Sequence, residues 1–96
     1  MKVQILDEAE QDLIEGFHFY EAQQAGLGDY FLDSLFSDIA SLHLYGGIHA
    51  RHFGFHRMLS RRFPFAIYYR IAGMTVRVYA VLDCRRNPRR IEERLK

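Results

Sequence analysis

The spacing of the apolar residues changes once along this chain, across the glycine-containing stretch between residues 46 and 54. Before it, apolar residues recur every three or four positions, which predicts amphipathic helices; after it, they alternate with polar residues, which predicts strands. The chain has 96 residues, the size of one domain. We therefore expect residues 1–96 to form a single α+β domain, with helices from the first half and a sheet from the second.

Two helices are expected in the first half. A short apolar run around Val3 predicts a first strand. Asp7 is a candidate N-cap for a helix over residues 8–24. Asp29 is expected to open a second helix, which stops before Gly46. The short link between these helices predicts an antiparallel helix hairpin, packed on one face of a small antiparallel sheet.

The second half predicts three strands and a short C-terminal helix. Residues 55–61 and the runs on either side of the Ala72-Gly73 turn supply the strands, and Pro88 to Leu95 is typical of a helix with proline near its start. The order is therefore β-α-α-β-β-β, followed by the helix. One face of the last hairpin is expected to be apolar and to comprise Phe65, Ile67, Tyr69, Ile71, Val76, Val78, Ala80 and Leu82. The other face is expected to be open.

The charges are divided between the two halves of the chain. Residues 1–50 carry one lysine and nine acidic residues, a net charge of −8. Residues 51–96 carry all eleven arginines, one lysine and three acidic residues, a net charge of +9. Such a basic half favours a partner that is acidic or carries phosphates, and arginine favours planar, bidentate contacts with either. The alternative is a dipolar domain whose halves attract each other.

Arginine and tyrosine side chains on the strands form the main candidate binding surface. Arginine interleaved with tyrosine suits phosphates with stacked bases, or an acidic amphipathic helix of a partner. A solvated strand face is the alternative interpretation. The candidates for contact with a target or partner are Arg57, Arg61, Arg62, Tyr68, Arg70, Arg77, Tyr79, Arg85 and Arg86.

The segment after the last strand is a second candidate. Arg85 and Arg86 are adjacent there, and the two together could hold a phosphate. The same segment contains Asn87-Pro88, which on its own marks a turn.

Histidine and cysteine give weaker signals. His49, His52 and His56 have a spacing that resembles that of metal ligands, but glycines surround them and no cysteine or carboxylate completes the set locally. We expect them to be exposed histidines, with no metal site and no cofactor. Cys84 has basic neighbours but no evident histidine partner to activate it as a nucleophile.

The sequence also bears on location. No apolar run approaches 18 residues, and the first residues are not typical of a secretory signal. The single cysteine cannot form an internal disulfide. These features favour a cytoplasmic protein without a membrane partner.

The chain resembles the RelE/ParE superfamily of bacterial type II toxin–antitoxin toxins. The resemblance covers nearly the whole chain, in pieces that are degenerate one by one but occur in the family's order and spacing. The matching residues are Ala9 to Leu13, Tyr20, Phe31, Leu35, Arg62 to Arg70, Val76 to Leu82, and Arg85 to Pro88. The resemblance implies the same β-α-α-β-β-β fold and a cognate antitoxin whose C-terminal segment wraps the toxin and blocks it.

The family divides by target. RelE-like members cleave mRNA on the ribosome; the residues that could serve this chemistry here are Arg61, Arg77, Tyr79, Arg85 and Arg86. The chain lacks a lysine in the second strand and a tyrosine or histidine after Arg86, and arginine is a poor base. The Phe63 to Arg70 run and the Arg85 to Pro88 segment look more ParE-like. We therefore favour a non-enzymatic toxin that binds and poisons DNA gyrase.

Two alternatives stay open. One is a ribosome-dependent mRNA endonuclease, and the other is a non-toxic member that only binds a partner. Without its antitoxin the chain is also expected to be able to form a homodimer through the basic sheet face.

Overall fold

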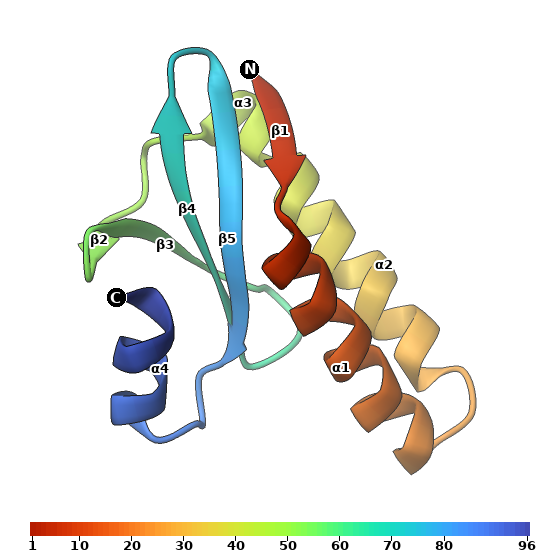
Figure 1. Cartoon of the computed structure of the whole chain (residues 1–96). Coiled ribbons are helices and arrows are strands. Elements are labelled where there is room, and N and C mark those ends of the chain that lie inside the picture. Colours follow the sequence, from red (N-terminus) through yellow and green to blue (C-terminus); the bar gives the residue numbers. More distant parts are fainter.

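The computed structural model describes all residues, 1–96, and confirms the expected order of elements (Figure 1). It also adds two short elements, α3 and β2, between the helix hairpin and the main strands. The elements are β1 (Lys2–Ile5), α1 (Asp7–Gln23), α2 (Leu27–Ala40), α3 (Leu42–Tyr45), β2 (Arg51–His52), β3 (Phe55–Leu59), β4 (Phe65–Ala72), β5 (Thr75–Asp83) and α4 (Pro88–Leu95). None of the helices has the length and apolar content that crossing a bilayer requires.

The strands form one five-stranded sheet in the order β1-β5-β4-β3-β2. All neighbouring pairs are antiparallel except β1 and β5, which run parallel, so the sheet is mixed where a wholly antiparallel one was expected. A parallel pair needs a long crossover connection. The chain between these two strands supplies one, and the helix hairpin is part of it.

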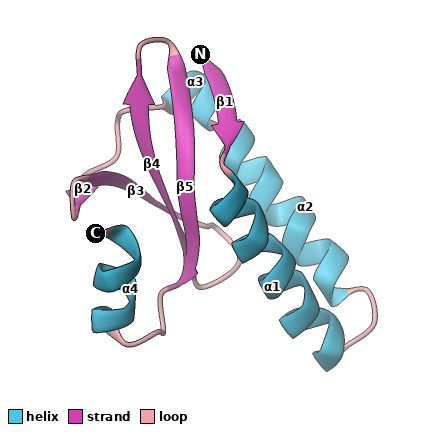
Figure 2. Ribbon diagram, viewed as in Figure 1, coloured by secondary structure: helices cyan, strands magenta, loops and turns pink.

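The hairpin of α1 and α2 packs on one face of the sheet, and α4 lies on the other side (Figure 2). The main core lies between the hairpin and the sheet. Among its residues with no measurable exposure are Phe31 and Leu35 of α2 and Ile67 and Tyr69 of β4.

Gly16 lets the two helices approach closely. A Cβ atom at this position would lie 2.5 Å from Cζ of Phe31, closer than packed atoms can approach. We expect Gly16→Ala to lower the free energy of unfolding by about 1–3 kcal/mol through overpacking, more than the roughly 1 kcal/mol that alanine gains in a helix. Urea denaturation measures the change, with the exposed Glu15→Ala as the control. A Gly16→Ala chain as stable as the parent would contradict this packing.

The helix ends differ in detail from the sequence prediction. Leu6, not Asp7, occupies the N-cap position of α1, and no side chain caps it. The second helix begins at Leu27, two residues before the expected Asp29. Its N-terminus is satisfied from α1, because the carboxylate of Glu21 accepts hydrogen bonds from the backbone N–H groups of Gly26 and Gly28 at 3.0 and 2.9 Å.

A β-bulge in β5 changes which residues face the core. Tyr68 pairs with Ala80 and Tyr69 pairs with Val78, so Tyr79 is an extra residue in the ladder. Beyond the bulge the alternation is reversed, and Val81 rather than Ala80 faces the helix hairpin. The predicted apolar face of Val76, Val78, Ala80 and Leu82 is therefore wrong after residue 78.

The second face of the sheet is only partly open. Leu95 of α4 packs there with Phe55, Tyr68 and other residues of a smaller core, and the exposed fraction of Tyr68 is 3%. The prediction of an open face is therefore wrong for the part that α4 covers. The C-terminal helix has the predicted bounds, with Pro88 in its first turn and Asn87 as its N-cap.

An ion pair connects α4 to α1 around the edge of the sheet. The guanidinium of Arg94 donates two hydrogen bonds to the carboxylate of Asp12, at 2.7 and 2.8 Å. The same carboxylate accepts the backbone N–H of Val81 at 3.0 Å. The strand β1 pairs with β5 only from Thr75 to Val78. Beyond that point the Asp12 carboxylate takes the place of a strand as hydrogen-bond acceptor for the β5 edge. We call these contacts the Asp12 clasp.

Candidate functional site

The structure buries one of the candidate residues and divides the others into three groups. Tyr68 lies in the core under α4 and offers no ring to a partner while that helix is in place. The others form a face cluster, a loop pair and a terminal pair. The face cluster is Arg57, Arg70, Arg77 and Tyr79 on the sheet; the loop pair is Arg61 and Arg62 between β3 and β4; the terminal pair is Arg85 and Arg86 after β5.

Arg70 of the face cluster is held by two aromatic rings and a backbone carbonyl. Its guanidinium carbon lies 3.9 Å from the ring centroid of Phe55 and 5.6 Å from that of Tyr79. Its Nε donates to the carbonyl of Gly54 at 3.3 Å, and Arg77 is its partner in the ladder. The two rings meet each other edge to face, and their cation–π contacts hold the guanidinium in place. Sequence analysis did not select Phe55, although its alternation with Arg57 along β3 places both on the same face.

Arg57 completes the face cluster next to the cysteine. It is half-buried, and one of its terminal nitrogens lies 3.9 Å from Sγ of Cys84. Cys84 itself is half-buried and packs against the smaller core. The guanidinium is thus its polar neighbour, and no activating histidine is among the contacts of the thiol.

The terminal pair is less free than its sequence implies. Arg85 is paired with Asp83, with its Nε 3.0 Å from Oδ1 and a terminal nitrogen 2.7 Å from Oδ2. These hydrogen bonds from Arg85 lower the pKa of Asp83. Arg85 nevertheless keeps 59% of its side-chain surface exposed. Arg86 is exposed as well and lines a hollow next to Phe19.

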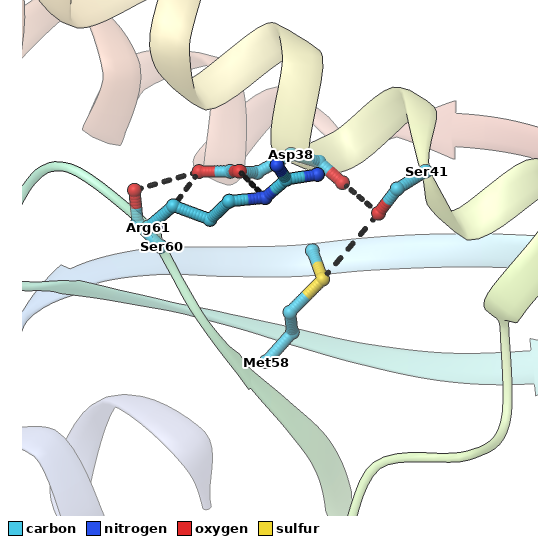
Figure 3. Close-up of polar contacts among 5 residues, drawn as sticks. All are labelled: Asp38, Ser41, Met58, Ser60 and Arg61. Atoms are coloured by element: carbon cyan, nitrogen blue, oxygen red, sulfur yellow. Dashed lines mark hydrogen bonds and ion pairs between the residues drawn. The ribbon is translucent and has the colours of Figure 1, made fainter.

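The loop pair is positioned by a buried carboxylate (Figure 3). Asp38 of α2 accepts hydrogen bonds from the Ser60 hydroxyl at 2.7 Å and from the backbone N–H of Arg61 at 3.3 Å. The guanidinium Nε of Arg61 is 3.8 Å from the same carboxylate, while 77% of the side chain stays exposed. Asp38 therefore fixes the loop and leaves the arginine accessible.

The histidines form a structural cluster around a buried tyrosine. The hydroxyl of Tyr69 accepts the backbone N–H of Gly47 at 3.0 Å and lies 2.5 Å from Nδ1 of His49, to which it donates. The ring of His56 stacks on Tyr69 with centroids 5.0 Å apart, and its Nδ1 donates to the carbonyl of His49 at 2.7 Å. Of His49, His52 and His56, only His52 is exposed, so the prediction of three exposed histidines is wrong for the other two. No three histidine, cysteine or acidic side chains are grouped to hold a metal ion.

The cluster makes stability dependent on pH. Burial, together with the nearby charge of His56, lowers the pKa of His49 from its ordinary 6.5. The unfolded chain then binds this proton more readily than the folded chain does. The free energy of unfolding is therefore highest at pH values above 6.5, where His49 is neutral in both states. It decreases as the pH falls through 6.5 toward the lowered pKa of His49 in the folded chain.

We expect His49→Gln to reduce this loss. Glutamine keeps an acceptor for the Tyr69 hydroxyl but does not titrate. Urea midpoints measured at about pH 7.5 and about pH 5 should differ less for His49→Gln than for the parent chain, while the exposed His52→Gln should behave like the parent. Equal pH dependence in all three chains would contradict the assignment.

The helix hairpin on one face of a mixed sheet, with cations and aromatic rings on the other, defines the class of small α+β domain to which the chain belongs. It is similar in structure to a chain of the solved "Chromosomal ParDE TA system from P. aeruginosa", with a TM-score of 0.76 and 15% sequence identity. The match covers 84% of this chain and 92% of the other. No protein-family model and no curated protein sequence matches the chain. The likeness confirms the fold that the family resemblance implied.

Proposed function

We propose that this chain is the toxin of a type II toxin–antitoxin system, is ParE-like, and arrests growth by binding and poisoning DNA gyrase. The observation that carries the proposal is the shared fold with a chain of a ParDE system over most of both chains. The exposed arginines supply the cationic surface that such a binding protein needs for an acidic or phosphate-bearing target. A cognate antitoxin neutralises the toxin in this proposal, and both act in the cytoplasm.

The separation of the arginines favours binding over catalysis. A nuclease needs its cations and its proton acceptor around one scissile phosphate, within hydrogen-bond reach. Arg77 lies near the β4–β5 turn, whereas Arg61 and Arg85 lie at the opposite end of the strands. The six residue steps along β5 from Arg77 to Asp83 amount to about 20 Å at about 3.3 Å per residue. The five nuclease candidates are therefore spread along the sheet, which supports a broad binding surface over a site built around one phosphate.

Expression in bacteria, with and without any small protein encoded beside it, tests the proposal. The chain alone is expected to stop growth, and coexpression is expected to restore growth and to give a complex that copurifies through a tag on either partner. Poisoned gyrase leaves broken DNA and induces the SOS response. A culture that grows normally while it contains soluble protein would contradict the toxin proposal.

The same experiment identifies the alternatives. Messenger RNAs cut within codons, with translation halted and DNA intact, would show a ribosome-dependent endonuclease instead. Tyr79 would then be the residue to substitute first, because its hydroxyl is the only polar group of the face cluster that is not a guanidinium. Copurification without growth arrest would show a member that only binds a partner.

A further inference from the structure

One end of the molecule carries a set of exposed apolar side chains around the β4–β5 turn. Segments far apart in the sequence meet there: the N–H of Lys2 donates to the carbonyl of Met74 at 2.9 Å, and the side chain of Ile71 packs so close to Gly47 that a Cβ there would lie 3.1 Å from its Cδ1. Met74 is 73% exposed. We call this set the apolar tip, and its members are Met1, Leu44, Ile48, Ile71 and Met74.

The stretches of chain that carry the apolar tip contain positive and neutral residues only. No aspartate or glutamate occurs between Asp38 and Asp83, and none occurs before Asp7. The amino group of Met1, which donates to the carbonyl of His43 at 3.2 Å, and the side chain of Lys2 are next to Met74. The tip therefore presents a protruding apolar knob with a positive rim.

The helix hairpin carries a surface of the opposite kind. A hollow of about 220 Å³ lies between α1 and α2. Ile14 and Phe36 on its rim are each 46% exposed. We call it the hairpin groove, and its lining residues are Ile5, Glu10, Leu13, Ile14, Leu32 and Phe36. No lysine or arginine occurs from residue 3 to residue 50, and acidic side chains such as Asp33, three residues before Phe36, are exposed beside it.

We propose that the apolar tip of one copy of this chain docks in the hairpin groove of a second copy. The tip offers flexible Met74 and branched Ile71 as a knob, and the groove offers an apolar hollow. The positive rim of the tip meets the negative rim of the groove, so attraction supports the fit. Both surfaces belong to one rigid domain and cannot meet within one molecule. A contact between two tips would instead place like charges together.

This contact is heterologous, since two different surfaces meet. It differs from the homodimer through the basic sheet face that the sequence suggested, because that face would bring arginines against arginines. The proposal rests on the two surfaces alone and is independent of the toxin function.

Sedimentation velocity of the purified chain tests the proposal directly. Association is expected to increase up to about 0.1 mM, where contacts of micromolar strength are occupied, and to weaken as salt is raised. Met74→Glu at the tip and Phe36→Lys in the groove should each weaken association by about tenfold or more. Leu59→Glu and Phe19→Lys are matched controls at exposed apolar positions outside both surfaces, and they should leave association unchanged.

A mixture of the two defective chains provides the sharpest measurement. The Phe36→Lys chain keeps an intact tip and the Met74→Glu chain keeps an intact groove, so the mixture should form a 1:1 complex that neither chain forms alone. A parent chain that stays monomeric throughout the range overturns the proposal. So does association that survives Met74→Glu, or a mixture that does not recover, because each would place any contact elsewhere. Circular dichroism of each variant confirms folding.

Discussion

Replacing Asp12 by alanine is expected to lower the free energy of unfolding by about 3 kcal/mol, the largest loss of stability we predict. The side chain of Asp12 is 6% exposed and accepts hydrogen bonds from both terminal nitrogens of Arg94 and from the backbone of Val81. Its loss leaves the Val81 N–H without its acceptor next to the core, and it leaves Arg94 only its 3.4 Å contact with Glu8 to join α4 to α1. Chemical denaturation followed by circular dichroism measures the change.

A matched set of variants separates the ion pair from general effects of substitution. Arg94→Met should also be strongly destabilising, because it leaves the Asp12 carboxylate buried with only one backbone donor. The double variant should cost less than the sum of the two single changes, since the partners share one interaction. Arg61→Met breaks the far more exposed contact with Asp38 and should stay within about 0.5 kcal/mol of the parent chain. Additive losses for Asp12 and Arg94 would contradict the clasp.

Replacing both Arg85 and Arg86 by alanine is expected to abolish most of the growth arrest while leaving the fold intact. Both side chains are exposed, and neither belongs to a core cluster, so each change should cost within about 0.5 kcal/mol of stability. Removing Arg85 also leaves the Asp83 carboxylate without its guanidinium, which adds an unpaired negative charge to the surface. The affinity for an anionic target should fall by about tenfold for each 1.4 kcal/mol of lost attraction.

The matched control is Arg89→Ala with Arg90→Ala. These arginines are exposed on α4, and their removal changes the net charge by the same amount. Colony counts after induction, read together with thermal melting of the purified chains, compare the two double variants. Equal loss of growth arrest in both would mean that only total charge matters. Full growth arrest by a well-folded Arg85→Ala/Arg86→Ala chain would move the target-binding surface to the face cluster and the loop pair.

Hydrophobic periodicity was sufficient to predict the helix hairpin and the strands β1, β3, β4 and β5, and a proline near its start indicated α4, whereas the short elements α3 and β2 were not predicted. It could not predict the bulge at Tyr79, since inserting one residue leaves the local composition unchanged and only the pairing with β4 displays it. The apolar pattern also could not predict that β1 pairs in parallel with β5. A strand of only four residues fits either direction, and the crossover connection decides which one forms.

The candidate site was predicted as a set of residue types and not as an arrangement. The charge division along the chain identified the arginines, but distant residues decide how each one is held. Arg70 depends on Phe55 from another strand, and Arg61 depends on Asp38 from α2. Tyr68 was assigned to an open face because it alternates with the apolar residues of β4, yet Leu95 of α4 packs with it in the smaller core.

The Asp12 clasp has a consequence for the order in which the molecule folds. Asp12 is made early in synthesis, but its partners Val81 and Arg94 are 69 and 82 residues further along the chain. The strand β1 likewise waits for β5, whose pairing residues begin at Thr75. Contacts between such distant segments form late, after loop closure has been overcome. A growing chain therefore holds its acidic helices long before the sheet that carries the arginines exists, and the cationic surface is assembled only when nearly all of the 96 residues have been joined.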